Sequence, residues 1–255
     1  MTEGLVVYAA LVLARVGTFV AVMPPFAART PKLVRVSLTL AITAFYLTAA
    51  APGWDPAFAQ AAVDIHPIRY ALALLREGLL GAAMGLAFTL FLLPARIAGE
   101  FVTGQIGLNI SPAVSPAGTD GGGPLTVAFE TAGGLLFLIA DGHHLVLLLL
   151  HLSFDKMPLG GSAMPQAAVL LSGLASAYEA GLLLAGPLAL CLLLLAVVLA
   201  VMSRAAPQLN VYSIGFTLQV TVALLGTLFL LPEIVRALAM TVGRVGDGMG
   251  DLLRA

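Results

Sequence analysis

The side chains best suited to chemistry are histidines that follow an aspartate. His143 and His144 come directly after Asp141-Gly142, and His151 follows His144 by close to two helical turns, on one helical face. Imidazole and carboxylate groups could bind a transition metal, but zinc uses three or four ligands with supporting groups, and no cysteine or additional acid stands at ligand spacing. The pattern therefore predicts histidines in ordinary hydrogen bonds and no metal site.

Ionisable side chains inside apolar runs form a second group of interest. Charges are costly there, so these residues should face protein or water and pair with one another. Several acids at helical spacing could relay protons, but here each acid stands almost alone, which favours structural or intersubunit pairing. Arg76 and Glu77 are sequence neighbours, so we expect them to point in different directions around a helix and to need separate partners. The candidate buried or intersubunit charges are Arg15, Arg76, Glu77, Glu100, Glu130, Asp141 and Arg204, with Glu179 in a similar setting.

No arrangement typical of an enzyme stands in the sequence. It contains no nucleophile elbow and no His-Glu-x-x-His pattern, and Gly121-Gly122-Gly123 precedes proline, whereas a phosphate-binding loop would continue with lysine. The single cysteine, Cys191, lies in an apolar run and is expected to be a small apolar filler. We therefore expect no catalytic residue, no cofactor and no metal.

Membrane-scale helices must position these residues. Of the 255 residues, 60% are hydrophobic and 10% are charged, against about 45–50% and about 25% in soluble domains. The net charge of -1 disfavours nucleic acid as a partner. Long apolar stretches separated by proline and glycine predict an all-α, integral-membrane-type bundle of about six helices, some broken, in a single domain over residues 1–255. The expected helices cover about 4–23, 36–51, 70–106, 125–152, 166–202 and 211–243. The stretch 125–152 is expected to be interrupted at Gly133-Gly134 and at Asp141.

The glycine spacing predicts close helix packing, and the N-terminal segment lacks the pattern of a cleaved signal peptide. Gly78, Gly81 and Gly85 recur at helical spacing and would allow neighbouring helices to approach closely. No basic segment precedes the first apolar stretch, so we expect this stretch to remain in the mature protein.

One connection, residues 107–124, differs from the others. It joins two strongly apolar helices and is rich in glycine and proline, so it cannot be helical. Irregular backbone at membrane depth persists only when it is buried in protein or lines a cavity. A plug and an ordinary solvent-exposed connection are both open at this point. The loop residues of interest are Gly107, Leu108, Asn109, Ile110, Ser111, Pro112, Ser115, Pro116, Gly118, Asp120, Gly121, Gly122 and Gly123.

Several segments together resemble the FliR/SctT family, whose members serve the flagellum or the injectisome. The strongest is the run 203–216, Ser-Arg-Ala-Ala-Pro-Gln-Leu-Asn-Val-Tyr-Ser-Ile-Gly-Phe, which is similar to the family's Arg-x-x-Pro-Gln-Leu-Asn-Val-Phe signature. The runs 98–108 and 136–144, and Arg15 with the prolines that follow it, also resemble the family, so that the resemblance covers nearly the whole chain. Within the signature we predict a structured turn that packs against partners, made of Pro207, Gln208, Leu209 and Asn210.

Two departures from the family pattern stand out. The family commonly has proline where Thr217 stands, and Asp-Pro where Ser115-Pro116 stands. The second departure weakens any role of the loop that depends on an acid at that position. Gly215-Phe216 after the signature leans towards the flagellar branch.

The resemblance implies a subunit of a protein export gate in the bacterial inner membrane, within a flagellar basal body or injectisome base and partly above the bilayer plane. One copy would complete a helical hetero-oligomer with two other small hydrophobic subunits, FliP/SctR-like and FliQ/SctS-like, together with further export-apparatus proteins. Unfolded protein substrates would pass through a central channel that the loop 107–124 helps to plug. Membrane lipid would surround the assembly, and Arg15, Glu77 and Glu130 would pair between chains.

Two other classes of protein are alternatives to an export subunit. Broken helices and intramembrane charges are typical of a secondary transporter or small-molecule channel, although no internal repeat relates the two halves of the sequence. A membrane-embedded enzyme would need catalytic groups that face a shared cavity, which the scattered histidines and acids do not supply.

Overall fold

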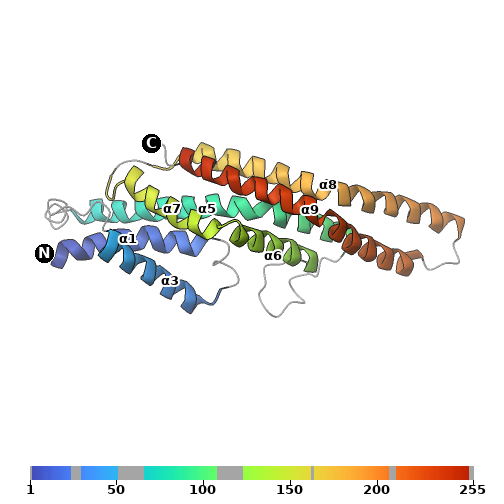
Figure 1. Cartoon of the computed structure of the whole chain (residues 1–255), viewed down its shortest axis with the longest axis horizontal. Helices are drawn as coiled ribbons and strands as arrows, with labels where there is room; N and C mark the ends of the chain where they lie inside the picture. The colour runs from blue at the N-terminus through green and yellow to red at the C-terminus, as the bar shows by residue number, and fades with distance from the viewer. Residues whose placement is uncertain are drawn as a thin grey trace. The chain divides into compact units, whose positions relative to one another are not determined.

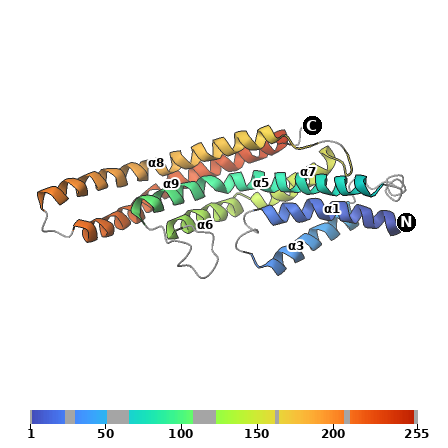
Figure 2. The same cartoon turned by 180° about the vertical axis from the view of Figure 1, so that it is seen from behind.

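The structure is a computed structural model that describes residues 2–23, 30–50, 66–107, 123–161, 164–206 and 211–252. Over these ranges all regular secondary structure is helical (Figure 1, Figure 2), which confirms the predicted all-α class. The elements are α1 (Thr2–Val22), α3 (Lys32–Phe45), the π-helical turn η1 (Tyr46–Ala50), α5 (Pro67–Ile106), α6 (Pro124–Ile139), α7 (Gly142–Lys156), α8 (Ala167–Ala205) and α9 (Val211–Leu252).

Several helices are long and apolar enough to cross a membrane. Four spans meet this criterion among the described residues, and α6 with α7 would add a fifth if the bent pair forms one span. The longest helices, α5 with 40 residues and α8 with 39, exceed the roughly 20 residues that a hydrocarbon core requires. The protein is therefore a membrane protein, as its composition predicts.

The apolar stretch 125–152, expected as one interrupted helix, is divided between α6 and α7. The division lies at Asp141, which has φ 55° and is the one described non-glycine residue with positive φ. A left-handed residue cannot continue a right-handed helix, so the hydrogen-bond ladder ends there. Gly133 and Gly134, the other expected interruption, remain inside α6.

The chain divides into two compact units, and both boundaries fall inside helices, in α5 and in α8. The first unit contains Met1–Phe91, Asp141–Leu174 and Gly243–Ala255, and the second contains Leu92–Ala140 and Ala175–Val242. The expectation of a single domain over residues 1–255 stays a prediction.

In the first unit, α1 packs against α3 and against the first part of α5. Phe19 of α1 meets Phe88 of α5 edge to face, with ring centroids 5.9 Å apart. At Gly81 the two backbones are so close that an added Cβ would collide with the carbonyl oxygen of Arg15 and with Oγ1 of Thr18. Glycine allows this approach because it has no side chain.

In the second unit, the end of α5, α6, α8 and α9 enclose an apolar core. α8 and α9 lie side by side in both views (Figure 1, Figure 2), and Leu188 of α8 fills the space beside Gly226 of α9. Between α5 and α6, an added Cβ at Gly99 would stand 2.6 Å from Cα of Thr126. The buried core residues here are Ala95, Ala98, Val102, Ile106, Leu125, Phe129, Ala185, Leu188, Leu192 and Ala223.

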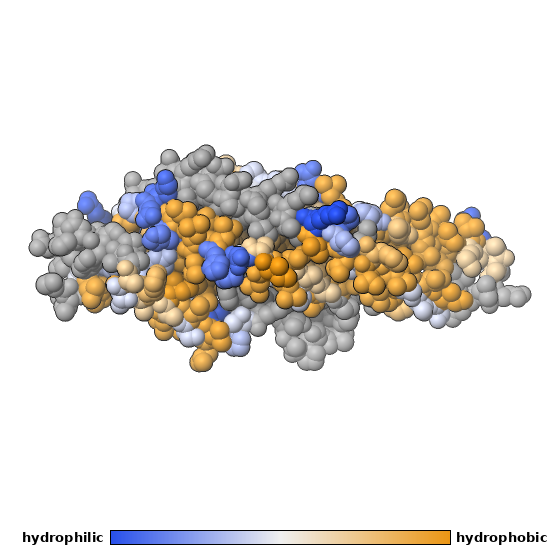
Figure 3. Space-filling model, viewed as in Figure 1, coloured by the Kyte–Doolittle hydropathy of each residue, from blue (hydrophilic) through white to orange (hydrophobic). Residues whose placement is uncertain are grey.

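Large apolar side chains also cover much of the outer surface. Figure 3 shows broad apolar areas on the visible face, and exposed residues such as Leu183 and Leu193 of α8 and Phe229 of α9 belong to this kind of surface. Soluble proteins rarely expose apolar patches of such extent. Lipid or other protein chains must therefore cover these helices.

Candidate functional site: charged groups on apolar helices

The most buried charged group of the described residues is an ion pair between α1 and α5. Both the Arg15 and the Glu77 side chains have 0% exposed surface, and Nε of Arg15 donates to Oε2 of Glu77 over 2.6 Å. A buried charge is destabilising unless it is paired and hydrogen-bonded. The charges that sequence analysis expected to pair between chains therefore satisfy each other within one chain.

The other donors of Arg15 bind the end of α7. Nη1 donates to the carbonyl oxygen of Ser153 over 2.9 Å, and Nη2 donates to that of Met157 over 2.8 Å. The guanidinium also lies over the ring of Phe154, 4.5 Å from its centroid. A cation at a helix C-terminus satisfies exposed carbonyl groups and opposes the negative end of the helix dipole. Arg15 thus caps α7 and joins it to α1.

Glu77 also binds its sequence neighbour, which corrects an expectation. Nη1 of Arg76 lies 3.0 Å from Oε1 of Glu77, whereas sequence analysis expected the two side chains to need separate partners. The rule for facing pairs on a helix concerns Cβ directions, and the long arginine side chain bends back across that separation. Oε1 also accepts the backbone N–H of Gly160 over 3.3 Å. One carboxylate thereby fixes α1, α5 and the turn after α7.

This network is suited to holding helices and poorly suited to moving protons. It contains a single carboxylate, bound by two guanidinium groups, and guanidinium groups stay protonated in proteins. A relay needs several groups that can exchange protons. We therefore assign the network a structural role in positioning α1, α5 and α7.

A second charged group lies in the other unit, on the two helices that flank the loop 107–124. Nε of Arg96 lies 2.8 Å from Oε1 of Glu100 and 3.7 Å from Oε1 of Glu130, which belongs to α6. These side chains are 43%, 48% and 27% exposed, respectively. Both acids were expected from the sequence, but Arg96 was not, although its position one helical turn before Glu100 was a usable signal.

Buried hydroxyl groups accompany this group. Oγ1 of Thr103 lies 3.3 Å from Oγ1 of Thr126, and Thr103 also donates to the carbonyl oxygen of Gly99 over 2.6 Å. Neither threonine was expected from the sequence, because their contact joins residues on different helices. They pair α5 with α6 directly beside the ends of the loop.

The structure describes only the ends of that loop. Gly107, with φ 72°, ends α5, and Gly123 is the N-cap residue of α6 with Pro124 at the first helical position. Leu108, Asn109, Ile110, Ser111, Pro112, Ser115, Pro116, Gly118, Asp120, Gly121 and Gly122 lie outside the described residues, as do Pro207, Gln208, Leu209 and Asn210.

The remaining predicted charges, Arg204 and Asp141, belong to neither charged group. Arg204 is exposed in the last turn of α8, and Asp141 is exposed at the start of α7. Cys191, expected as a filler, is exposed on α8.

Comparison with known proteins places these features in a family context. Residues 6–245 match the family model described as "Bacterial export proteins, family 1". The flagellar biosynthetic protein FliR of Escherichia coli (strain K12) is 32% identical over 216 residues, which cover 83% of this chain and 79% of the relative.

More distant relatives extend this similarity. FliR of Aquifex aeolicus is 31% identical over 182 residues, with 68% of this chain and 69% of the relative covered. The surface presentation of antigens protein SpaR of Shigella sonnei is 28% identical over 146 residues, 57% of this chain and 56% of the relative. The region that matches the family model contains both charged groups.

Proposed function

The chain belongs to the bacterial export proteins, family 1, as a subunit of a flagellar or type III protein export apparatus, and we propose that it forms part of the protein-conducting channel. Unfolded proteins would cross the inner membrane there, and the loop 107–124 would plug the passage between transport events. The subunit binds and gates without catalysing a reaction. Its partners would be two small hydrophobic subunits, FliP/SctR-like and FliQ/SctS-like, together with further apparatus proteins.

The observation that carries the channel assignment is the charged group on α5 and α6. Arg96, Glu100 and Glu130 place partly exposed charge on the stretches of α5 and α6 that flank the loop, where most neighbouring residues are apolar. Lipid does not tolerate exposed ionic groups, so these side chains require water or another protein as a neighbour. Because they stand within a few turns of Gly107 and Gly123, a water-filled passage would lie beside the loop.

The composition of the loop supports the plug. Glycine and proline allow backbone conformations that a helix excludes, and irregular backbone at membrane depth persists where it lines a cavity. A glycine- and proline-rich loop between two apolar helices could therefore close the passage and move out of it when a substrate passes. The exposed apolar surfaces of α8 and α9 would be covered by partner subunits and by lipid.

Cysteine labelling tests the channel wall. In a Cys191→Ser background, which removes the exposed native thiol, Glu100→Cys is expected to react nearly completely with a membrane-impermeant maleimide in the assembled apparatus. The thiolate is the reactive form, and a lipid-facing thiol does not ionise. Labelling is measured in intact cells and in inverted vesicles, so that the reagent approaches from either side of the membrane.

The matched control is Leu193→Cys, at an exposed apolar position of α8. It is expected to stay largely unlabelled in both preparations. Equal labelling of the two positions, or none at position 100 in either preparation, would contradict a water-filled passage beside α5.

Shortening the loop tests the plug. Deletion of residues 118–123 is expected to leave assembly intact, so that the tagged chain still co-purifies with two small hydrophobic subunits in mild detergent. The same cells should become leaky to small ions, because the seal is lost. The control variant Asp120→Asn keeps the loop length, so cells that carry it should remain impermeable to small ions. Unchanged ion permeability after the deletion would rule out the plug, and recovery of the wild-type chain alone would favour a transporter.

A further inference from the structure

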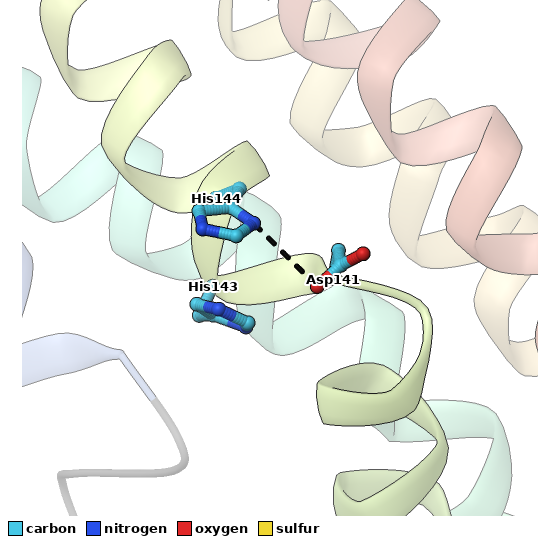
Figure 4. Close-up of side chains that lie close together, drawn as sticks. All are labelled: Asp141, His143 and His144. Carbon is cyan, nitrogen blue, oxygen red and sulfur yellow. Dashed lines mark ion pairs between the residues drawn. The ribbon is translucent and has the colours of Figure 1, made fainter.

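We propose that Asp141, His143 and His144 bind a divalent transition-metal ion at the exposed start of α7. Figure 4 shows the three side chains close together, with the Asp141 carboxylate turned towards His144. No metal site was expected here from the sequence, but the structure brings the carboxylate of Asp141 close enough to both histidines to act as a third ligand. This site shares no residue with either charged group and does not depend on the proposed channel.

The ligand atoms already stand close to metal-binding distances. One atom from each residue can be chosen so that all three lie within 4.8 Å of one another. Nδ1 of His144 is 3.5 Å from Oδ1 of Asp141, and the two imidazole rings have centroids 4.1 Å apart. Bonds of about 2.0–2.1 Å place tetrahedral ligands roughly 3.4 Å from one another. Exposed side chains can close the remaining distance by rotamer changes.

The backbone at Asp141 explains why spacing alone did not reveal the site. In an uninterrupted helix, residues two apart point to opposite sides, so Asp141 and His143 could not share an ion. Asp141 lies outside α7 with φ 55° and ψ 26°, and this left-handed conformation brings its carboxylate to the same side as the imidazoles. Such backbone is unfavourable for a residue with a side chain and often accompanies function.

The carboxylate of Asp141 does not cap the helix, although its position at the start of α7 would allow it. Asp141 is the N-cap residue of α7, but its side chain makes no capping hydrogen bond. Aspartate at this position usually accepts a backbone N–H of the first turn. Here the carboxylate faces an imidazole and remains available to a cation. Its negative charge also offsets the positive end of the α7 dipole, which by itself would repel a metal ion.

The donor set indicates which ions the site would take. Two imidazole nitrogens and one carboxylate oxygen suit Zn²⁺, Co²⁺ or Ni²⁺, whereas Ca²⁺ and Mg²⁺ prefer shells of oxygen. The Asp141 and His144 side chains are 74% and 72% exposed, so water can occupy the remaining coordination positions. His151 lies further along α7, stacked on Tyr46, and takes no part.

Metal titration of the full chain tests this proposal. The detergent-solubilised protein, carrying no polyhistidine tag, is titrated with Zn²⁺ against a chromophoric chelator, and Co²⁺ absorption reports the ligand field. We expect one ion per chain. Removal of one supporting group around a bound metal weakens affinity by about 10- to 100-fold, so His143→Ala, His144→Ala and Asp141→Asn should each weaken binding at least tenfold.

The controls are the other two histidines, in the variant His66→Ala with His151→Ala, which should bind as the wild type does. All these side chains are exposed, so the variants should fold, and circular dichroism checks that they do. The proposal is overturned if the wild type binds no Zn²⁺ at submillimolar concentration. It is also overturned if the His143→Ala, His144→Ala double variant binds as tightly as the wild type.

Discussion

Replacing Glu77 by leucine is expected to lower the free energy of unfolding by about 3–5 kcal/mol, the range for breaking a buried ion pair by removing one partner. Glu77 binds both Arg15 and Arg76, so its loss leaves two guanidinium groups near each other with no carboxylate between them. The backbone N–H of Gly160 loses its acceptor as well. Thermal unfolding of the detergent-solubilised protein, followed by the loss of helical signal, measures the change.

A matched surface pair provides the control. Arg236 and Glu233 lie 3.2 Å apart on α9 with both side chains exposed, and such pairs contribute only about 0–1 kcal/mol. Glu233→Leu should therefore leave the unfolding temperature almost unchanged.

The double variant tests whether the effect arises from unpaired charge. Combining Glu77→Leu with Arg15→Leu removes the buried cation together with its partner and should recover part of the lost stability. Equal losses at positions 77 and 233, or a double variant that adds the two single losses, would contradict the assigned role of the pair.

Gly81→Ala is expected to destabilise the protein by about 1–3 kcal/mol, the range for overpacking a well-packed core. The new methyl group would collide with the carbonyl oxygen of Arg15, which belongs to a backbone, and with Oγ1 of Thr18. α1 and α5 would have to separate, and this movement would also disturb the ion pair between them. The same unfolding assay measures the loss.

Gly134 of α6 is the matched control, because an added Cβ there would have no neighbour within 4 Å. Alanine favours a helix over glycine by about 1 kcal/mol, so Gly134→Ala should be neutral or slightly stabilising. If Gly81→Ala behaved in the same way, the close packing of α1 on α5 would be wrong.

Much of the secondary structure could be predicted from the sequence, because a lipid environment restricts which backbone structures are stable. Long apolar runs in a membrane must satisfy every backbone group internally, which leaves the helix as the natural element. The expected helix 70–106 corresponds closely to α5, and the expected break at Asp141 lies between α6 and α7. The match to the export family confirms the resemblance that the run 203–216 indicated.

The partners of the charges could not be predicted in the same way. Sequence rules relate residues within a helix, whereas Arg15 and Glu77 are 62 positions apart and meet through tertiary packing. The expectation of pairing between chains assumed that each acid stood alone, and the structure brings Arg15 to Glu77 and Arg96 to Glu130 within one chain. The closeness of the Asp141 carboxylate to the His144 imidazole was also not expected, because residue spacing does not reveal the left-handed backbone at Asp141.

The lengths of α5 and α8 determine how much of this protein can be embedded. At 1.5 Å per residue, their 40 and 39 residues extend about 60 Å, twice the roughly 30 Å hydrocarbon thickness. A straight helix of this length would need an inclination of about 60° to fit, beyond the observed range of about 0–40°. On α8, exposed apolar side chains occur from Leu171 to Val201, about 45 Å along the helix, with the exposed Glu179 among them. Parts of α5 and α8 must therefore lie outside the acyl-chain region. Neighbouring polypeptide would have to shield the exposed apolar side chains there from water.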